Sequence, residues 1–317
     1  MTKHSLTAAD LKGRVHAAIM TIRQDEYEAM EARLGPVQPV TGKNTYKFAE
    51  LTLDGSDPIS VVLTRVVRQG NARAQSVASN IIEELDPAWL LLVGIAGGVP
   101  DTEYSLGDVV LSTYLHDFSL TAINDKGVTY EAGGGEMHRD VERFLSTRAV
   151  GTDGKRLSEL AGFNSDPAIT NHPPVYAPGI PENKRYYGSP AFRKNVKSTI
   201  EARFPDGKRD GGPVIRQGPS ANGNVLVKST ELLKQWQQSA RQVVDIEMEL
   251  AGVYEAARTA GRENYPVLCI RGLSDIVGFA RDRKWTGYAC LTAAAFASAV
   301  LQSGFIDFSA NLPKNPQ

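Results

Sequence analysis

The stretch WLLLVGIAGGVP, residues 89–100, places five apolar residues directly before Gly94. A continuous apolar run of this kind is typical of a β-strand that is covered on both faces, as in a parallel sheet flanked by helices. Gly97 and Gly98 follow closely, and glycines let the backbone turn against a ligand or a neighbouring segment. We therefore predict a buried central strand that leads into a glycine turn.

Strand and helix patterns alternate on both sides of this stretch. Short apolar runs predict strands, and apolar residues spaced three and four apart predict helices that cover a sheet. The alternation predicts a three-layer α/β/α fold with a mixed central sheet. The expected strands include residues 15–22, 46–53, 59–67, 106–112, 266–272 and one that ends in 245–249, and the expected helices include residues 24–34, 71–85, 250–260 and 287–302.

Residues 119–212 depart from this alternation. They are rich in glycine, proline and charged residues, with helical patterns only near 138–147 and 190–204. Long loops inside a domain are commonly functional, so we expect an insertion that forms a lid or a subunit contact. We expect residues 1–317 to form a single domain with this insertion at about 119–212.

The composition argues against several classes of protein. The formal net charge is −1, so no overall basic field favours a nucleic acid or a membrane as a partner. The longest apolar stretch, residues 287–301, is shorter than the ~18 residues that a membrane helix needs. Cys269 and Cys290 lie in apolar runs, which predicts buried free thiols and a cytoplasmic protein. The five histidines are scattered without zinc-site spacing, so we expect neither a metal nor a cofactor.

Three acidic residues alternate with apolar ones in DIEMELAGVYEAA, residues 245–257. In one interpretation Asp245, Glu247 and Glu249 form the solvated face of an edge strand. In the other, the end of the strand presents a carboxylate to a crevice, where it can accept two hydrogen bonds from the vicinal hydroxyls of a ribose. The pattern alone leaves both interpretations open.

A second polar pair follows the apolar run of IRGLSDIVG, residues 270–278. We predict a strand that breaks at Gly272, so that Ser274 and Asp275 lie beyond its carboxyl end, where ligands of open α/β sheets bind. The alternative is a helix N-cap, a common role for serine and aspartate after a strand. For Glu26, which follows the first predicted strand, the alternative is the general preference for acidic residues at helix N-termini.

The motifs together resemble those of purine nucleoside phosphorylases and of methylthioadenosine/S-adenosylhomocysteine nucleosidases. EMELAGVYEAA is similar to the E-M-E-A-A-G signature of the phosphorylases, and Met248-Glu249 match the M-E pair of the nucleosidases. LSDIVG, VGIAGGVP and LGDVVLS resemble further family segments. GPSANGNVLVK, residues 218–228, resembles the G-x-x-x-S-G-[DN]-x-V loop, with Asn222 where serine is usual. The matches occur in family order between residues 15 and 302, whereas the insertion is not covered.

A second resemblance is more specific. VGIAGGVP and CIRGLSDIVGFARDRKWTGYACLTAAAFA, residues 269–297, are similar to phosphorylase-like domains fused to NTPase and repeat modules in fungal and bacterial immune-type proteins. This resemblance implies a role in antiviral defence and a nucleotide substrate such as ATP. We also expect a homo-oligomer, a dimer or higher.

The resemblance implies an N-ribosidase that separates a purine base from C1′ of ribose. Asp275 matches the residue that protonates the leaving base, and Glu26 matches the carboxylate that orients water in nucleosidases. The residues expected to bind substrate are Glu249 and Met248 at the ribose, Ser274 beside Asp275, Gly97, Gly98, Gly223 and Asn224 around the base, and Glu247, while Arg23, Arg65 and Arg68 are candidates to hold phosphates on C5′.

Two positions favour water over phosphate as the nucleophile. Family phosphorylases carry an arginine and a serine where this sequence has Leu92 and Ile95, so two anion contacts are missing. Glu26 would also repel a phosphate. Two alternatives stay open: a phosphate-dependent purine nucleoside phosphorylase, and a non-catalytic domain that senses a purine nucleoside.

Overall fold

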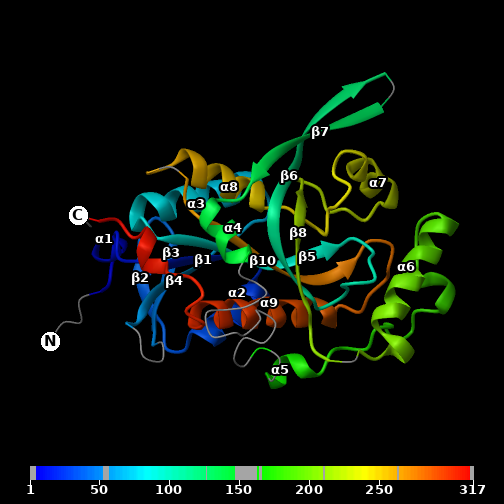
Figure 1. The fold of residues 1–317 in the computed structure, drawn as a ribbon, viewed down its shortest axis with the longest axis horizontal. Helices are drawn as coiled ribbons and strands as arrows, with labels where there is room; N and C mark the ends of the chain where they lie inside the picture. Colours follow the sequence, from blue (N-terminus) through cyan, green and yellow to red (C-terminus); the bar gives the residue numbers. More distant parts are fainter. Residues whose placement is uncertain are drawn as a thin grey trace.

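The computed structural model describes residues 5–52, 57–125, 127–146, 163, 166–209, 211–262 and 264–314. In these ranges ten strands form one mixed sheet with helices on both faces (Figure 1), which confirms the predicted α/β/α architecture. The strands are β1 Ala17–Thr21, β2 Gln38–Thr41, β3 Thr45–Leu51, β4 Ile59–Arg65, β5 Trp89–Gly98, β6 Val109–Asn124, β7 Gly127–Glu136, β8 Ile215–Asn222, β9 Asp245–Glu247 and β10 Val267–Ile276.

The sheet has the strand order β10-β6-β8-β9-β5-β1-β4-β3-β2, with β7 paired to β6. Because β10 pairs with β5 as well as with β6, the strands β5, β9, β8, β6 and β10 close into a ring. The strands β4, β1, β5 and β10 are parallel neighbours, so their carboxyl ends meet at one edge of the sheet. That edge is where ligands bind in sheets of this kind.

Four helices cover the sheet. Helices α2, Gln24–Leu34, and α9, Lys284–Gln302, pack together on one face, and α3, Asn71–Leu85, and α8, Leu250–Thr259, pack together on the other (Figure 1). The other helices are α1 Ala8–Leu11, α4 Arg139–Ser146, α5 Pro167–Thr170, α6 Pro190–Arg203, α7 Thr230–Ser239 and the short 3₁₀ helices Glu182–Lys184, Pro205–Gly207 and Phe308–Asn311. In the part of the chain that the structure describes, no helix combines the length and apolarity that would let it span a membrane.

The predicted central strand is correct but extends further than expected. Residues 89–94 of β5 are all buried, in agreement with their continuous apolar character. The prediction of a glycine turn after Gly94 is wrong, because β5 continues through Gly97 and Gly98. Likewise β10 does not break at Gly272 but runs to Ile276. The two strands pair in parallel from Val267 onward, and this ladder holds both extended past their glycines.

The first part of the expected insertion forms a β-hairpin rather than loops. Strand β6 continues to Asn124 and pairs in antiparallel fashion with β7, and Figure 1 shows this hairpin projecting from the body of the molecule. The prediction of long loops was wrong here because most of β7 is exposed, so no apolar alternation marks it in the sequence.

Candidate active site

A cleft lies at the carboxyl edge of the sheet, where β5 and β10 end and β9 pairs with β5 in antiparallel fashion. It brings together six residues that the sequence analysis assigned to one site: Gly97, Glu247, Met248, Glu249, Ser274 and Asp275. The other residues of its wall are Gln69, Ile95, Ala96, Val225, Leu226, Val227, Ile246 and Val277. The site therefore draws on segments separated by about two hundred residues of sequence.

Ser274 and Asp275 reach the cleft through a β-bulge. Leu273 pairs with Ala96 and Asp275 pairs with Gly97, so Ser274 is an extra residue between them. Consecutive residues of a regular strand point to opposite faces, but a bulge re-aims side chains and is common beside active sites. Both side chains consequently line the same cleft.

The carboxyl group of Asp275 has two different oxygens. Oδ1 accepts a hydrogen bond from the Ser274 hydroxyl at 2.8 Å and lies 3.7 Å from Nη2 of Arg281. Oδ2 lies 3.3 Å from the position that a Cβ on Gly97 would take. No helix begins at Asp275, since α9 starts only at Lys284, so the helix-cap alternative is wrong.

Glu249 lies at the start of α8, where it is buried with 5% of its surface exposed. Its Oε1 accepts a hydrogen bond from the Gly70 backbone N–H at 3.1 Å, and its Oε2 lies 3.7 Å from Nη2 of Arg271. Burial, assisted by the neighbouring Glu247 charge and opposed by Arg271, raises the pKa of Glu249 to about 7. The carboxyl group therefore changes its charge near neutral pH.

Protein donors bind both oxygens of Glu247. Its Oε2 accepts hydrogen bonds from the backbone N–H groups of Glu249 and Leu250, each at 2.9 Å, and from Arg271 at 2.7 Å. Its Oε1 accepts a hydrogen bond from Asn222 at 2.5 Å. The interpretation of this segment as a solvated edge strand is wrong. Strand β9 lies between β8 and β5, and all three of its residues are buried.

The sequence analysis gave no role to Arg271, which proves to be central to the site. Its guanidinium is fully buried, and Nε and Nη1 have no hydrogen-bond partner among the described residues. A buried charge needs partners, so an arginine inside the apolar run of β10 was the signal that could have identified it.

Glu26 is fixed by three backbone N–H groups. Its Oε2 accepts from Ile22 at 2.8 Å and from Arg23 at 2.9 Å, and its Oε1 accepts from Ile95 of β5 at 2.9 Å. The first two bonds cap α2, so the preference for an acidic residue at a helix N-terminus is part of the explanation. Each carboxylate oxygen has about two acceptor positions, so Oε1 keeps one after its bond to Ile95.

Gly94 allows Glu26 and Arg271 to approach each other. A Cβ on Gly94 would lie 2.6 Å from Nη1 of Arg271 and 2.7 Å from Oε1 of Glu26, so those two atoms lie at most 5.3 Å apart. Glu26 is bound at Ile95 and Asp275 faces Gly97, two residues further along β5, which corresponds to about 7 Å of strand. The carboxyl groups of Glu26 and Asp275 therefore both lie beside the carboxyl-terminal end of β5.

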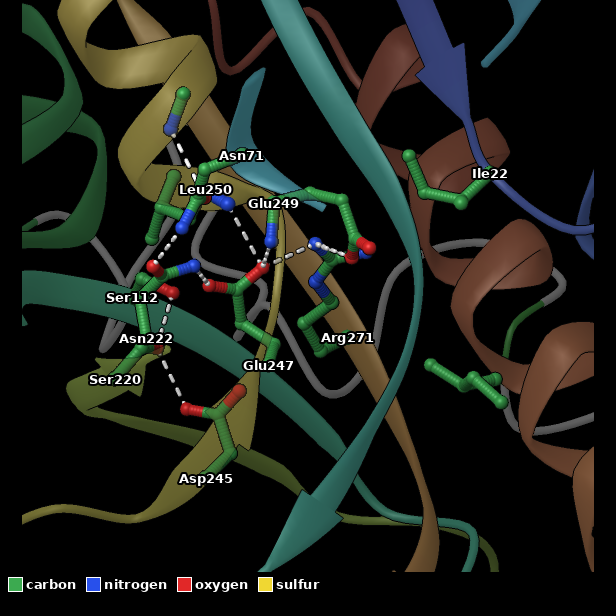
Figure 2. A network of polar contacts seen from close by, with 12 residues as sticks. Ile22, Asn71, Ser112, Ser220, Asn222, Asp245, Glu247, Glu249, Leu250 and Arg271 are labelled. Carbon is green, nitrogen blue, oxygen red and sulfur yellow. Dashed lines mark hydrogen bonds and ion pairs between the residues drawn. The ribbon is translucent and has the colours of Figure 1, made fainter. Parts of the chain in front are cut away.

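Polar contacts extend from this cluster toward α3 (Figure 2). Asn222, which donates to Glu247, accepts a hydrogen bond from the Asn71 side chain at 2.6 Å. In a neighbouring chain of contacts, the Ser220 hydroxyl donates to Oδ1 of Asp245 at 2.6 Å. Complete burial raises the pKa of Asp245 to about 7.

Three residues expected around the base do not line the cleft. Asn224 is exposed and its Oδ1 accepts a hydrogen bond from the Asn71 backbone, while Gly223 packs against Trp236. Gly98 faces Ile276. The loop does border the cleft, but through the next three residues, which the family pattern did not mark: Val225, Leu226 and Val227.

The arginines expected to hold phosphate divide into two groups. Arg23 forms an ion pair with Asp25 at 2.8 Å. Arg65 and Arg68 line a second cleft, which is described further below. Among the residues that the structure describes, no group of three or more histidine, cysteine, aspartate or glutamate side chains is arranged to hold a metal ion.

Comparison with known sequences agrees with this geometry. A model of the phosphorylase superfamily matches residues 17–302. The chain is 23% identical over 273 residues to the ATP nucleosidase Cap17 of Escherichia coli. This alignment covers 84% of this chain and 46% of that protein. It is 25% identical over 224 residues to a nucleotide-binding leucine-rich repeat (NLR)-like protein of Hyaloscypha variabilis, covering 67% and 21%. The chain thus spans less than half the length of either relative.

Solved structures with the same fold include three hydrolases. The 5′-methylthioadenosine/S-adenosylhomocysteine nucleosidase of Neisseria meningitidis matches with a TM-score of 0.54 at 17% identity, over 90% of this chain and 98% of that one. The nucleosidase of S. pneumoniae gives 0.57 at 17% identity, over 90% and 98%. Futalosine hydrolase of Helicobacter pylori gives 0.51 at 14% identity, over 93% and 97%. At these identities the likeness establishes the fold.

Proposed function

Because the chain belongs to the phosphorylase superfamily, we propose that it is an N-ribosidase that hydrolyses the bond between a purine base and C1′ of a nucleoside or nucleotide. One observation carries this proposal. Glu249 and Asp275 line one cleft, and Glu26, which does not line it, accepts a hydrogen bond from the backbone N–H of Ile95 in its wall. Each of the three keeps at least one carboxylate acceptor position that no donor of the described residues fills, as a site that acts on a substrate requires.

Asp275 is the proposed general acid. As the C1′–N9 bond breaks, its electron pair moves into the purine, and a proton from Asp275 to N7 lets the base leave as a neutral molecule. Oδ2 faces the cleft beside Gly97, and Ser274 holds Oδ1 at 2.8 Å. A positioned acid of this type contributes about 10²–10⁴-fold in rate.

Glu249 is the proposed ribose ligand. Once ionised, it can accept hydrogen bonds from both the 2′ and the 3′ hydroxyl, because Oε2 accepts no hydrogen bond from the described residues and Oε1 accepts only one, from Gly70. Met248 lines the same wall and offers an apolar surface to the sugar. We assign Glu247 a positioning role, because its oxygens are occupied by protein donors.

Glu26 and Arg271 are proposed to prepare the water. Oε1 of Glu26 keeps one acceptor position, and it accepts the proton that water loses as the new C1′–O bond forms. Nη1 of Arg271, at most 5.3 Å from that oxygen, has no partner among the described residues and can donate to the same water.

Two features of β5 support hydrolysis over phosphorolysis. The Ile95 backbone N–H, at the position where phosphorylases of the family carry a serine, donates to Glu26. Leu92, at the position of their arginine, is fully buried in β5. A phosphate bound beside Ile95 would face the Glu26 carboxylate. It would also lack the arginine and serine contacts that phosphorylases of the family provide.

Product analysis tests the proposal. Base release from adenosine, AMP or ATP in phosphate-free buffer should yield free adenine together with ribose, ribose 5′-phosphate or ribose 5′-triphosphate, respectively, without stimulation by inorganic phosphate. Ribose-1-phosphate as a product, formed only with phosphate, would instead identify a phosphorylase. Binding of these compounds with no release of base under either condition would identify a sensing domain.

The proposal extends to the wider role of the protein. We propose a cytoplasmic homo-oligomer that acts in defence, supported by the two buried free cysteines and by the similarity to a nucleotide-binding leucine-rich repeat (NLR)-like protein. Light scattering of the purified chain tests the oligomer, since a mass of about 34.4 kDa would correspond to a monomer and contradict it.

A further inference from the structure

A second cleft lies at the same edge of the sheet, one strand further along. It has a volume of about 610 Å³, which is within the range of small-molecule sites. It is placed over the carboxyl ends of β1 and β4 and the start of β3, and its wall includes Lys43, Arg65, Arg68 and Arg73. Neighbouring strands are about 4.8 Å apart, so the two clefts are adjacent.

The second cleft is strongly basic. Four cationic side chains line it, and no aspartate or glutamate is among the described residues of its wall. Lys43 is neutralised by Glu83, whose Oε2 lies 2.6 Å away. Arg65, Arg68 and Arg73 form no ion pair or hydrogen bond through their side chains with the described residues. In a chain with a net charge of −1, this concentration of unpaired positive charge makes a local field that attracts anions.

One short segment forms part of both clefts. Arg65 ends β4, and Arg68 lines the basic cleft. The next residue, Gln69, lines the active-site cleft, and the N–H of Gly70 donates to Glu249 at 3.1 Å. Gly70, which binds Glu249, is only two residues after Arg68 in the chain. A ligand whose ribose is held by Glu249 therefore lies close to Arg68.

We propose that the basic cleft binds the 5′-phosphates of the substrate, so that the substrate class is a nucleoside 5′-polyphosphate. The proposal rests on the function proposed above. Guanidinium groups bind phosphate oxygens through paired, charge-assisted hydrogen bonds. One phosphate monoester carries about −1.5 to −2 charges at pH 7, so three unpaired arginines exceed what a monophosphate needs. Arg73 also lies in the first turn of α3, whose positive end favours anions.

Phosphate in this cleft could also be inorganic phosphate acting as a nucleophile. The two sources differ in what they predict. A 5′-phosphate subsite makes ATP a better ligand than AMP, and AMP a better ligand than adenosine. A nucleophile site makes base release depend on added phosphate.

The test uses the full chain with Arg68→Ala/Arg73→Ala, and Arg193→Ala as the matched control. Arg68, Arg73 and Arg193 are all exposed, so neither protein should be destabilised appreciably, and Arg193 lines a different surface hollow. We expect wild-type protein and the control to bind ATP at least tenfold more tightly than adenosine, measured by calorimetry. In the double variant this ratio should fall at least tenfold, and the corresponding kcat/KM ratio should fall with it.

The outcomes separate the two proposals. If ATP binds no better than adenosine, or if the double variant keeps the wild-type ratio, the phosphate subsite is refuted while adenosine cleavage still supports the N-ribosidase. If inorganic phosphate stimulates base release and the double variant loses that stimulation, the cleft holds the nucleophile and the subsite is refuted. If the binding ratio behaves as expected but no base is released, the subsite stands and the proposed function fails.

Discussion

Arg271 and Glu247 form an ion pair in which Nη2 lies 2.7 Å from Oε2 and neither side chain is exposed to solvent. The same guanidinium lies 3.7 Å from Glu249. Because Glu247 is also bound by two backbone N–H groups at the start of α8, the pair connects β10 to the segment that carries Glu249. The ion pair therefore determines where the proposed ribose ligand lies.

Removing one partner of the Arg271–Glu247 ion pair should destabilise the protein. We expect Arg271→Met to lower the free energy of unfolding by about 3–5 kcal/mol, because Glu247 would be left as an uncompensated buried charge. Urea denaturation measures this. Arg262→Ala is the control, since Arg262 is partly exposed, lies 3.8 Å from Asp86 and donates one hydrogen bond to the Pro87 carbonyl at 3.0 Å, so its loss should cost only about 1–2 kcal/mol. Equal losses for the two variants would contradict the account.

A methyl group at Gly94 should disturb the site more than one at Gly97. At Gly94 the added Cβ would lie 2.6 Å from Arg271 and 2.7 Å from Glu26, whereas at Gly97 its nearest neighbour is Oδ2 of Asp275 at 3.3 Å. We expect Gly94→Ala to lower kcat/KM about 10²-fold, the effect of a displacement near 1 Å. Gly97→Ala, measured in the same assay, should lose less. The reverse order would show that Glu26 and Arg271 do not contribute to the reaction.

Asp245 should make the protein less stable as pH rises. Its pKa is raised from an ordinary value of 3.8 to about 7 by burial. The stabilising contribution of the bound proton is therefore fully present below pH 3.8 and is lost as the pH rises through the folded-state value of about 7. Asp245→Asn stays neutral, so its free energy of unfolding, relative to wild type, should increase between about pH 4 and pH 7 by at most about 1.4 kcal/mol per pH unit and level off above pH 7.

Chemical denaturation at several pH values measures that difference. Asp57→Asn, a change at an exposed position, is the control and should follow the wild-type profile. Parallel profiles for wild type and Asp245→Asn would show that Asp245 is already ionised in the folded protein.

Glu249 should impose a pH dependence on activity. Burial raises its pKa to about 7, and only the ionised form accepts two hydrogen bonds from the ribose hydroxyls. We expect kcat/KM to rise with pH through about 7, since this parameter reports groups of the free enzyme. Glu249→Gln should lower kcat/KM about 10- to 100-fold and abolish this rise. A rise that persists in the variant would assign it to another group.

The sequence predicted the parts of the molecule whose signals are local. The buried apolar run of β5 and the spacing in α3 correctly indicated a layered α/β fold. The polar pair Ser274-Asp275 was correctly located in a cleft, but the bulge that turns both side chains toward it depends on pairing with β5. Pairing across the sheet leaves no local pattern.

Other features were not predictable for the same reason. Burial of Glu247 depends on β8 and β5 lying on either side of β9, so alternation alone suggested a solvated edge. Most of β7 is exposed, so no apolar alternation marks this arm of the hairpin in the sequence, and the prediction of loops there was wrong. Arg271 was present in the motif, but its partners Glu247 and Glu249 are more than twenty residues away in the sequence.

The central claim is that Asp275 gives a proton to the leaving purine. Asp275→Asn removes that proton and keeps the shape of the side chain. Asp282→Asn is the matched control, because Asp282 accepts a hydrogen bond from the Lys284 backbone at the start of α9 and has no proposed part in the reaction. Asparagine keeps the Oδ1 acceptor and caps helices about as well as aspartate, so this control should lose little stability.

The most direct measurement is the rate of base release from purine nucleosides and nucleotides in phosphate-free buffer, with a melting curve for each protein. We predict that Asp275→Asn lowers kcat about 10²–10⁴-fold while KM and the melting temperature change little. Asp282→Asn should keep both its melting temperature and its kcat close to wild type. Release of base by Asp275→Asn at a rate near wild type, or no release by the wild-type protein from any of these compounds, would contradict the account.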